Sequence, residues 1–135
     1  MIARGAMNIR VSGAVVALAL TVSATTPIGA HHTVAAVYDA TKTVTLSGLV
    51  TQVDWQFPHI IFHLDVRNAD GSTTNWDVET VNPQGMRRHG LTEDFVKAGD
   101  RVSMEVLLAK DGTRHAALET ITTSTGTTYL SMVPR

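Results

Sequence analysis

Apolar and polar residues alternate along short runs from Thr43 onward, and this period of two is typical of β-strands. The first run, residues 43–56, changes phase near Gly48, which predicts a long strand with a bulge or sharp bend at that glycine. Runs at residues 59–67 and 73–81 flank a hairpin turn at residues 68–71. Two more strands are expected, over residues 101–109 and from about Arg114 onward.

The inward phase of each run defines the expected core. In the first strand the phase change predicts that Leu49, Val53 and Trp55 face inward, after Val44 and Leu46. In the second strand His63 and Asp65 take the outward phase. Nine positions are expected to form one core: Val44, Val53, Ile60, Phe62, Leu64, Val78, Val102, Met104 and Val106.

A short helix is predicted between the third and fourth strands. Asn82 can cap its N-terminus, Pro83 suits the first helical position, and Gly90 can end it in the left-handed conformation. Residues 92–95 are expected to add one helical turn. The order of three strands, a helix and two strands predicts an all-β fold with one short helix, an OB-like five-stranded, partly closed Greek-key barrel. A small open β-sandwich of the same strands is the alternative.

Residues 1–30 have the order of a secretory signal peptide: Arg4 and Arg10, an apolar run over residues 11–22, then small residues. The run has 12 residues, fewer than the ~18–20 that cross a bilayer as a helix, so no membrane span is expected after cleavage. Cleavage is predicted between Ala30 and His31, and a cut after Ala24 is the alternative. We therefore expect a periplasmic or secreted protein with a signal peptide at 1–30, a leader at 31–42 and a barrel domain at 43–135.

Composition narrows the range of partners. Removal of 30 residues leaves 105 of the 135, with nine basic and twelve acidic side chains and a formal charge of −3. The chain has no cysteine, which excludes disulfides and thiolate metal sites. An acidic chain without a basic run is not expected to bind nucleic acid.

Several short motifs carry a resemblance to a known family. They are Ala30-His31-His32, Tyr38-Asp39, Leu46-Ser47-Gly48 with Val50, Trp55 followed by Pro58-His59, Trp76 with Glu79, Asn82-Pro83, Arg87-Arg88, and residues 97–100. In these motifs the chain resembles a family of small exported bacterial proteins known only as a domain of unknown function. The resemblance covers essentially the whole mature sequence. It implies export and brings no activity with it.

The two consecutive histidines after the predicted cleavage site suggest a metal. If His31 is the first residue, its α-amine and imidazole can chelate one ion, and a further imidazole from His32 or His59 completes a nitrogen set that suits Cu(II). A free α-amine has a pKa near ~7.7–8.0, so copper can displace its proton at neutral pH. The alternative is that the histidines are polar residues of a leader, in a module that binds a protein or small ligand without metal.

Other polar and aromatic residues carry weaker hypotheses. Trp55, Phe57 and Trp76 could stack on a ligand, although the inward phase of both tryptophans favours a core role. His63 is expected near Asp65, and His89 and His115 on the surface. Glu79 is expected to pair with Arg87 or Arg88. No hydrolase, phosphate-binding or zinc-protease motif occurs, so the sequence predicts a binding module rather than an enzyme.

Overall fold

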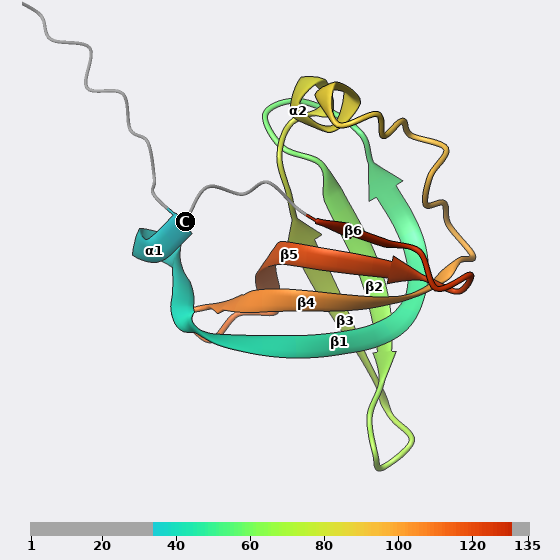
Figure 1. Ribbon diagram of the computed structural model, residues 1–135. Coiled ribbons are helices and arrows are strands. Elements are labelled where there is room, and N and C mark those ends of the chain that lie inside the picture. The colour runs from blue at the N-terminus through green and yellow to red at the C-terminus, as the bar shows by residue number, and fades with distance from the viewer. Residues whose placement is uncertain (1–33, 131–135) are drawn as a thin grey trace, which may run out of the picture. The chain divides into compact units, whose positions relative to one another are not determined.

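The computed structural model describes residues 34–130. Its long first strand, β1 (Tyr38–Asp54), pairs with two different strands. β1 pairs antiparallel with β4 (Arg101–Ala109) over residues 43–49 and with β2 (Ile61–Arg67) over residues 48–54. β2 pairs with β3 (Thr73–Glu79), and β4 pairs with β5 (His115–Thr123). A parallel pairing of β3 with β5 closes the ring of five strands (Figure 1). The predicted OB-like barrel is therefore confirmed over the open sandwich.

Gly48 lies where β1 passes from one partner to the other, since it pairs with both Val66 and Val102. A Cβ atom at this position would lie 2.3 Å from the backbone oxygen of Asp65, so only glycine fits this close approach. The change of phase, however, occurs after Val50, where the register with β2 shifts. Val50 is therefore fully buried, and the prediction that Leu49 faces the core was wrong.

The barrel interior contains the predicted core. Seven of the nine expected residues are buried, and Val44 and Val53 are partly buried against the same cluster. β5 adds apolar side chains that the sequence pattern did not include: Ala116, Leu118 and Ile121. Met86, Leu91 and Val96 come from the connection between β3 and β4 and cover one end of the barrel.

The predicted helix is α2 (Pro83–Arg88), and its ends are formed as expected. The side chain of Asn82 accepts a hydrogen bond from the Gly85 amide at 2.8 Å, and Gly90 has φ of 75°. The helical turn expected at residues 92–95 was wrong: the chain forms only a hydrogen-bonded turn, from the Phe95 amide to the Thr92 carbonyl. Phe95 and Val96 pack against the barrel core, and the rest of this connection consists of turns and bends.

Residues 31–42 were expected to form a leader; within this range, α1 (Val34–Val37) and the start of β1 lie in the described part of the chain, and residues 31–33 lie outside it. α1 leads directly into Tyr38, which pairs with Ala109; regular pairing with β4 then resumes at Thr43, where the strand was predicted to start. Tyr38 packs against Leu107, Ala109 and Ala117 in a small apolar cluster on the outer side of β4 and β5. The period-two pattern had assigned these positions of β4 to solvent.

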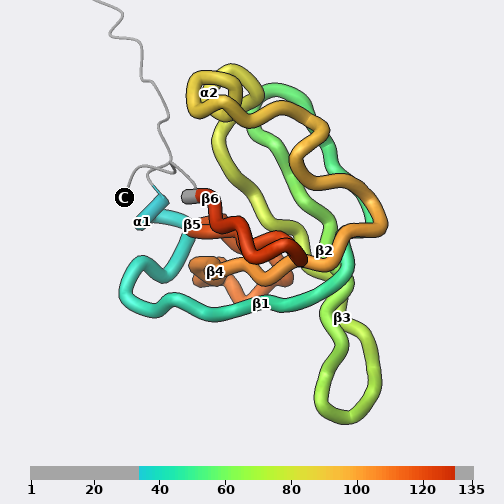
Figure 2. The backbone as a smooth tube through the Cα atoms, turned by 45° about the vertical axis from the view of Figure 1, so that its right-hand side comes forward, coloured from blue at the N-terminus to red at the C-terminus, as the bar shows by residue number. Residues whose placement is uncertain are grey.

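The remaining elements lie at the edges of the barrel. A sixth strand, β6 (Thr128–Leu130), pairs with β5 and was not predicted from the threonine-rich sequence. The hairpin between β2 and β3 projects beyond the other strands in both views (Figure 1, Figure 2). Neither of the two helices in residues 34–130 is long and apolar enough to span a membrane.

Candidate functional site

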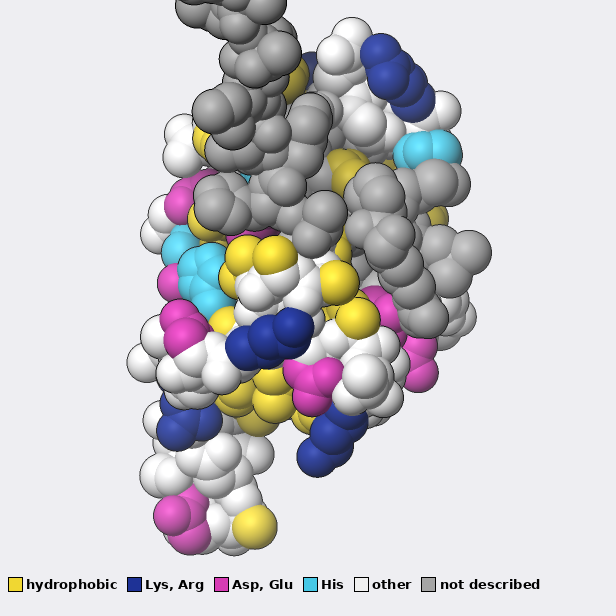
Figure 3. Space-filling view, turned by 90° about the vertical axis from the view of Figure 1, so that its left-hand side faces the viewer, with side chains coloured by type: hydrophobic (Ala, Val, Ile, Leu, Met, Phe, Trp, Pro, Cys, Tyr) yellow, Lys and Arg dark blue, Asp and Glu magenta, His cyan; other side chains and the backbone are white. Residues whose placement is uncertain are grey.

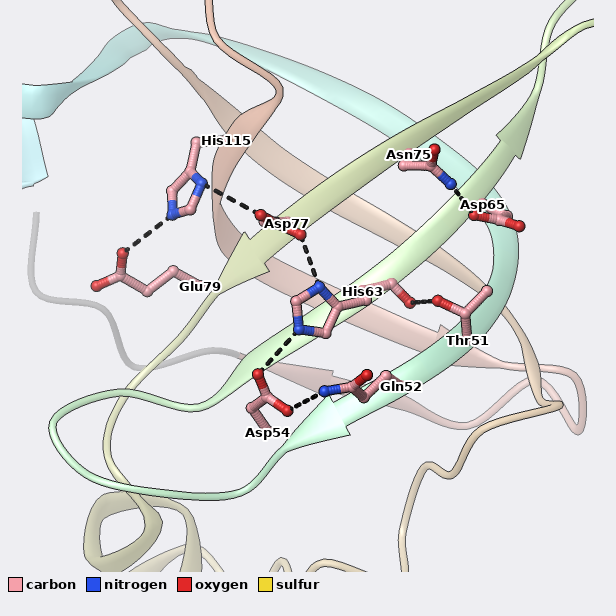
Figure 4. Close-up of polar contacts among 9 residues, drawn as sticks. All are labelled: Thr51, Gln52, Asp54, His63, Asp65, Asn75, Asp77, Glu79 and His115. Atoms are coloured by element: carbon pink, nitrogen blue, oxygen red, sulfur yellow. Dashed lines mark hydrogen bonds and ion pairs between the residues drawn. The ribbon is translucent and has the colours of Figure 1, made fainter.

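Histidine and carboxylate side chains alternate across the outer face of β1, β2, β3 and β5 (Figure 4). The space-filling view shows imidazole and acidic groups gathered beside one another on one flank of the barrel (Figure 3). We call this set the imidazole–carboxylate row. Its members, in spatial order, are Asp54, His63, Asp77, His115, Glu79 and His59.

His63 contacts a carboxylate at each of its two ring nitrogens. Its Nε2 lies 3.0 Å from Asp54 Oδ2, and its Nδ1 lies 2.7 Å from Asp77 Oδ1. Partial burial lowers the pKa of His63, but the hydrogen bonds and negative charges of Asp54 and Asp77 outweigh it, so the pKa is raised above its ordinary value. The hydrogen bond from His63, followed by that from Gln52, lowers the pKa of Asp54. His63 was expected near Asp65, whose side chain instead accepts from Asn75.

His115 occupies a looser position between two carboxylates. The parallel pairing places it beside Asp77, and its two ring nitrogens lie 3.8 Å from Asp77 Oδ2 and 3.9 Å from Glu79 Oε2. These distances exceed those of hydrogen bonds, so the attraction is electrostatic and requires a protonated imidazole. The expected surface histidine is therefore half-buried and belongs to the row.

Glu79 connects the row to residues 34–38, which we call the N-terminal segment. Its Oε2 accepts a hydrogen bond from the Tyr38 hydroxyl at 2.9 Å, and its Oε1 faces Nδ1 of His59. These contacts replace the expected ion pair with Arg87 or Arg88, because Glu79 projects from the outer face of β3, opposite Ala117 of β5. Burial, together with the hydrogen bond to Glu79, raises the pKa of Tyr38, so its hydroxyl remains a donor at neutral pH.

Of the predicted metal ligands, His59 lies in the described part of the chain, while His31 and His32 lie outside it. His59 lies in the loop between β1 and β2, residues 55–60, and its side chain is 51% exposed. Within residues 34–130, no group of three or more histidine, aspartate or glutamate side chains is arranged to hold a metal ion. The row pairs its groups along a line rather than around one point. The predicted metal site thus depends on the residues that precede Val34.

The three aromatic candidates lie in different surroundings. The ring of Trp55 packs edge-on against that of Phe95, with 6.3 Å between the ring centres. Its Nε1 is buried with no hydrogen-bond partner among residues 34–130. Arg114 lies over Trp76, 5.4 Å from the ring centre. Both tryptophans pack against the barrel core, as their inward phase indicated. Phe57, which is joined to Pro58 by a cis peptide bond, is 64% exposed in the loop between β1 and β2.

Sequence reasoning missed Tyr38, Asp54, Asp77 and His115 as members of one site. The alternation of β3 places Asp77 and Glu79 on the same face, and this signal was available in the sequence. The contribution of His115 depends on the pairing of β3 with β5, which no local pattern reveals. The position of Tyr38 depends on the apolar cluster outside the barrel.

Comparison with known proteins places the chain in a family. It belongs to a family of unknown function, DUF6152, whose model matches residues 17–118. No curated protein sequence matches it. Among solved structures, the chain is similar to a mitochondrial single-stranded DNA binding protein from S. cerevisiae, with 13% identity and a TM-score of 0.48, over 62% of this chain and 93% of that one. A similarity of this size says nothing about what the present chain binds.

Proposed function

We propose that this member of a family of unknown function is an exported binding module that takes one Cu(II) ion at its mature N-terminus. The ligands are the α-amine and imidazole of His31, with a further imidazole from His32 or His59. Amine and imidazole nitrogens lie where copper heads the affinity order of divalent metals, and the chain has no thiolate to favour another ion.

The observation that carries the proposal is the pairing of His59 with Glu79. Metal-binding histidines commonly present one ring nitrogen to the ion while the other donates to a carboxylate, which fixes the tautomer and the ring orientation. Nδ1 of His59 faces Glu79 Oε1, so Nε2 is the nitrogen left to bind a metal. The side chain of His59 is half-exposed, as a residue that receives an ion from solvent must be.

The course of the N-terminal segment supports the same site. Tyr38 donates to the carboxylate that faces His59, and the Lys110 amide donates to the Val37 carbonyl at 2.9 Å. In a chain that starts at His31, three residues precede Val34. Three residues extend at most about 11 Å. In that chain the α-amine of His31 would be three residues from the segment whose Tyr38 donates to Glu79.

A second candidate function follows from Phe57. Its side chain is exposed in the loop that also contains His59, and OB-like barrels bind ligands with such loops and the adjoining strand face. A small or protein ligand that stacks on Phe57 would need no metal. Binding of such a ligand would be lost in Phe57→Ala and unchanged by a chelator.

The test is a Cu(II) titration of the mature protein and its His59→Gln variant. Loss of the His59 imidazole should weaken Cu(II) binding by at least ~10-fold, because even the loss of a group that only orients a metal ligand usually costs this much. His89→Gln is the matched control, because His89 caps the far end of α2 and belongs to no part of the row. If both variants bind like the wild type, His59 is not a ligand.

A further inference from the structure

We infer that Tyr38 is a positioning residue that couples the docking of the N-terminal segment to the orientation of His59, through the carboxylate of Glu79. The inference rests on the proposed function, because it assigns Tyr38 a role in the same copper site. The Tyr38 hydroxyl donates to Glu79, and the role inferred for Tyr38 is exerted through that carboxylate.

The two oxygens of Glu79 have separate partners. Oε1 faces His59, whereas Oε2 accepts from the Tyr38 hydroxyl at 2.9 Å and lies 3.9 Å from His115 Nε2. With Oε2 held by Tyr38, the plane of the carboxylate is fixed, and Oε1 keeps its direction towards His59. Without that donor, the carboxylate is free to turn towards His115, and His59 loses its fixed partner.

The ring and the hydroxyl of Tyr38 contribute differently. The ring is buried against Leu107, Ala109 and Ala117, and Val34 packs on the same cluster. A phenylalanine ring would fill this space equally well, so packing does not require the oxygen. The hydroxyl adds a hydrogen bond between residues 41 positions apart and joins the apolar cluster to the imidazole–carboxylate row.

Backbone contacts set the place of the segment independently of Glu79. Tyr38 pairs with Ala109, the Lys110 amide donates to the Val37 carbonyl, and the Lys110 ammonium donates to the Ala35 carbonyl at 2.5 Å. The segment is therefore attached to the turn between β4 and β5. The Tyr38 hydroxyl connects the segment to His59, because it donates to the carboxylate that faces His59.

The experiment compares Tyr38→Phe with the wild type in the mature protein that begins at His31. Cu(II) affinity should fall by about 10-fold, as for other groups that orient a ligand from behind. The Cu(II) EPR spectrum should also change, because His59 no longer holds one orientation. Thr43→Val is the matched control: it removes a hydroxyl of the same strand that donates to Glu119 at 2.7 Å, away from His59. Its affinity and spectrum should equal those of the wild type.

A measurement without metal separates this inference from the proposed function. The ¹⁵N chemical shifts of the His59 ring nitrogens report the partner of Nδ1, and they should change in Tyr38→Phe but not in Thr43→Val. Unchanged His59 shifts in Tyr38→Phe would overturn the coupling, whether or not the protein binds copper. Changed shifts with equal copper affinity in wild type and His59→Gln would keep the coupling and reject His59 as a copper ligand.

Discussion

His63 lies between Asp54 and Asp77, with each of its ring nitrogens within 3.0 Å of a carboxylate oxygen. One imidazole thereby joins the last residue of β1 to the middle of β3, across β2. A neutral imidazole has only one N–H group and can donate to one of these carboxylates, whereas a protonated imidazole donates to both. The strength of this bridge therefore depends on pH.

We expect the bridge to stabilise the fold most between about pH 4 and pH 6.5. The pKa of His63 is raised above 6.5, so its contribution is complete below that value and is lost as the pH rises through the folded-state pKa. The pKa of Asp54 is lowered below 3.8, so its contribution is complete above that value and is lost as the pH falls through the folded-state pKa. The two limits define the window.

The measurement is the free energy of unfolding of the wild type and of His63→Gln at pH 5.5 and pH 8.5. The difference between the two proteins should be larger at pH 5.5 by about 1 kcal/mol, the size of a partly exposed charged hydrogen bond. An NMR titration gives a direct control, since Asp54→Asn should lower the pKa of His63. A wild-type His63 that titrates below 6.5 would contradict the prediction.

Gly48→Ala should destabilise the barrel by about 1–3 kcal/mol, because a methyl group there would overlap the backbone of Asp65. Urea unfolding monitored by tryptophan fluorescence measures the change. Thr45→Ala, at an exposed position of the same strand, is the control and should cost less than ~1 kcal/mol. Equal stability of Gly48→Ala and Thr45→Ala would mean that β1 does not pass this close to β2.

Processing gives a third prediction. Intact mass of the protein recovered from the exported fraction should correspond to a chain that begins at His31, because Ala30 is the last small residue before the histidine pair. A mass that corresponds to a start at Thr25 would place His31 inside the chain. It would then remove the α-amine from the proposed chelate.

The sequence predicted the strands well because alternation is local. The alternation predicted for residues 59–67 held for Ile60, Phe62 and Leu64, which are buried, and for His63, which faces outward. β1 was harder, because its bulge occurs after Val50 and not at the glycine. Gly48 signals a close backbone approach, and a close approach leaves the same mark in a sequence as a bulge does.

The candidate site was predicted only in part, because its contacts cross the closure of the barrel. His59 was identified as a possible distant imidazole ligand, but its partner Glu79 was assigned to the arginines of α2. Glu79 meets Tyr38 only because residues 34–38 fold over β4 and β5, and His115 joins the row only because β5 pairs with β3. Contacts between residues so far apart in sequence leave no periodic trace.

The most direct test of the copper proposal compares the mature protein with a form whose α-amine at His31 is acetylated. Acetylation leaves every side chain in place and prevents the terminal nitrogen from binding the metal, so the chelate with the His31 imidazole is lost. We predict that the Cu(II) affinity falls by at least ~100-fold. At 1.4 kcal/mol for each factor of ten, this fall corresponds to about 2.8 kcal/mol of lost binding free energy. Equal affinities of the two proteins, measured by competition at pH 7.5, would show that the amine is not a ligand and would contradict the proposal.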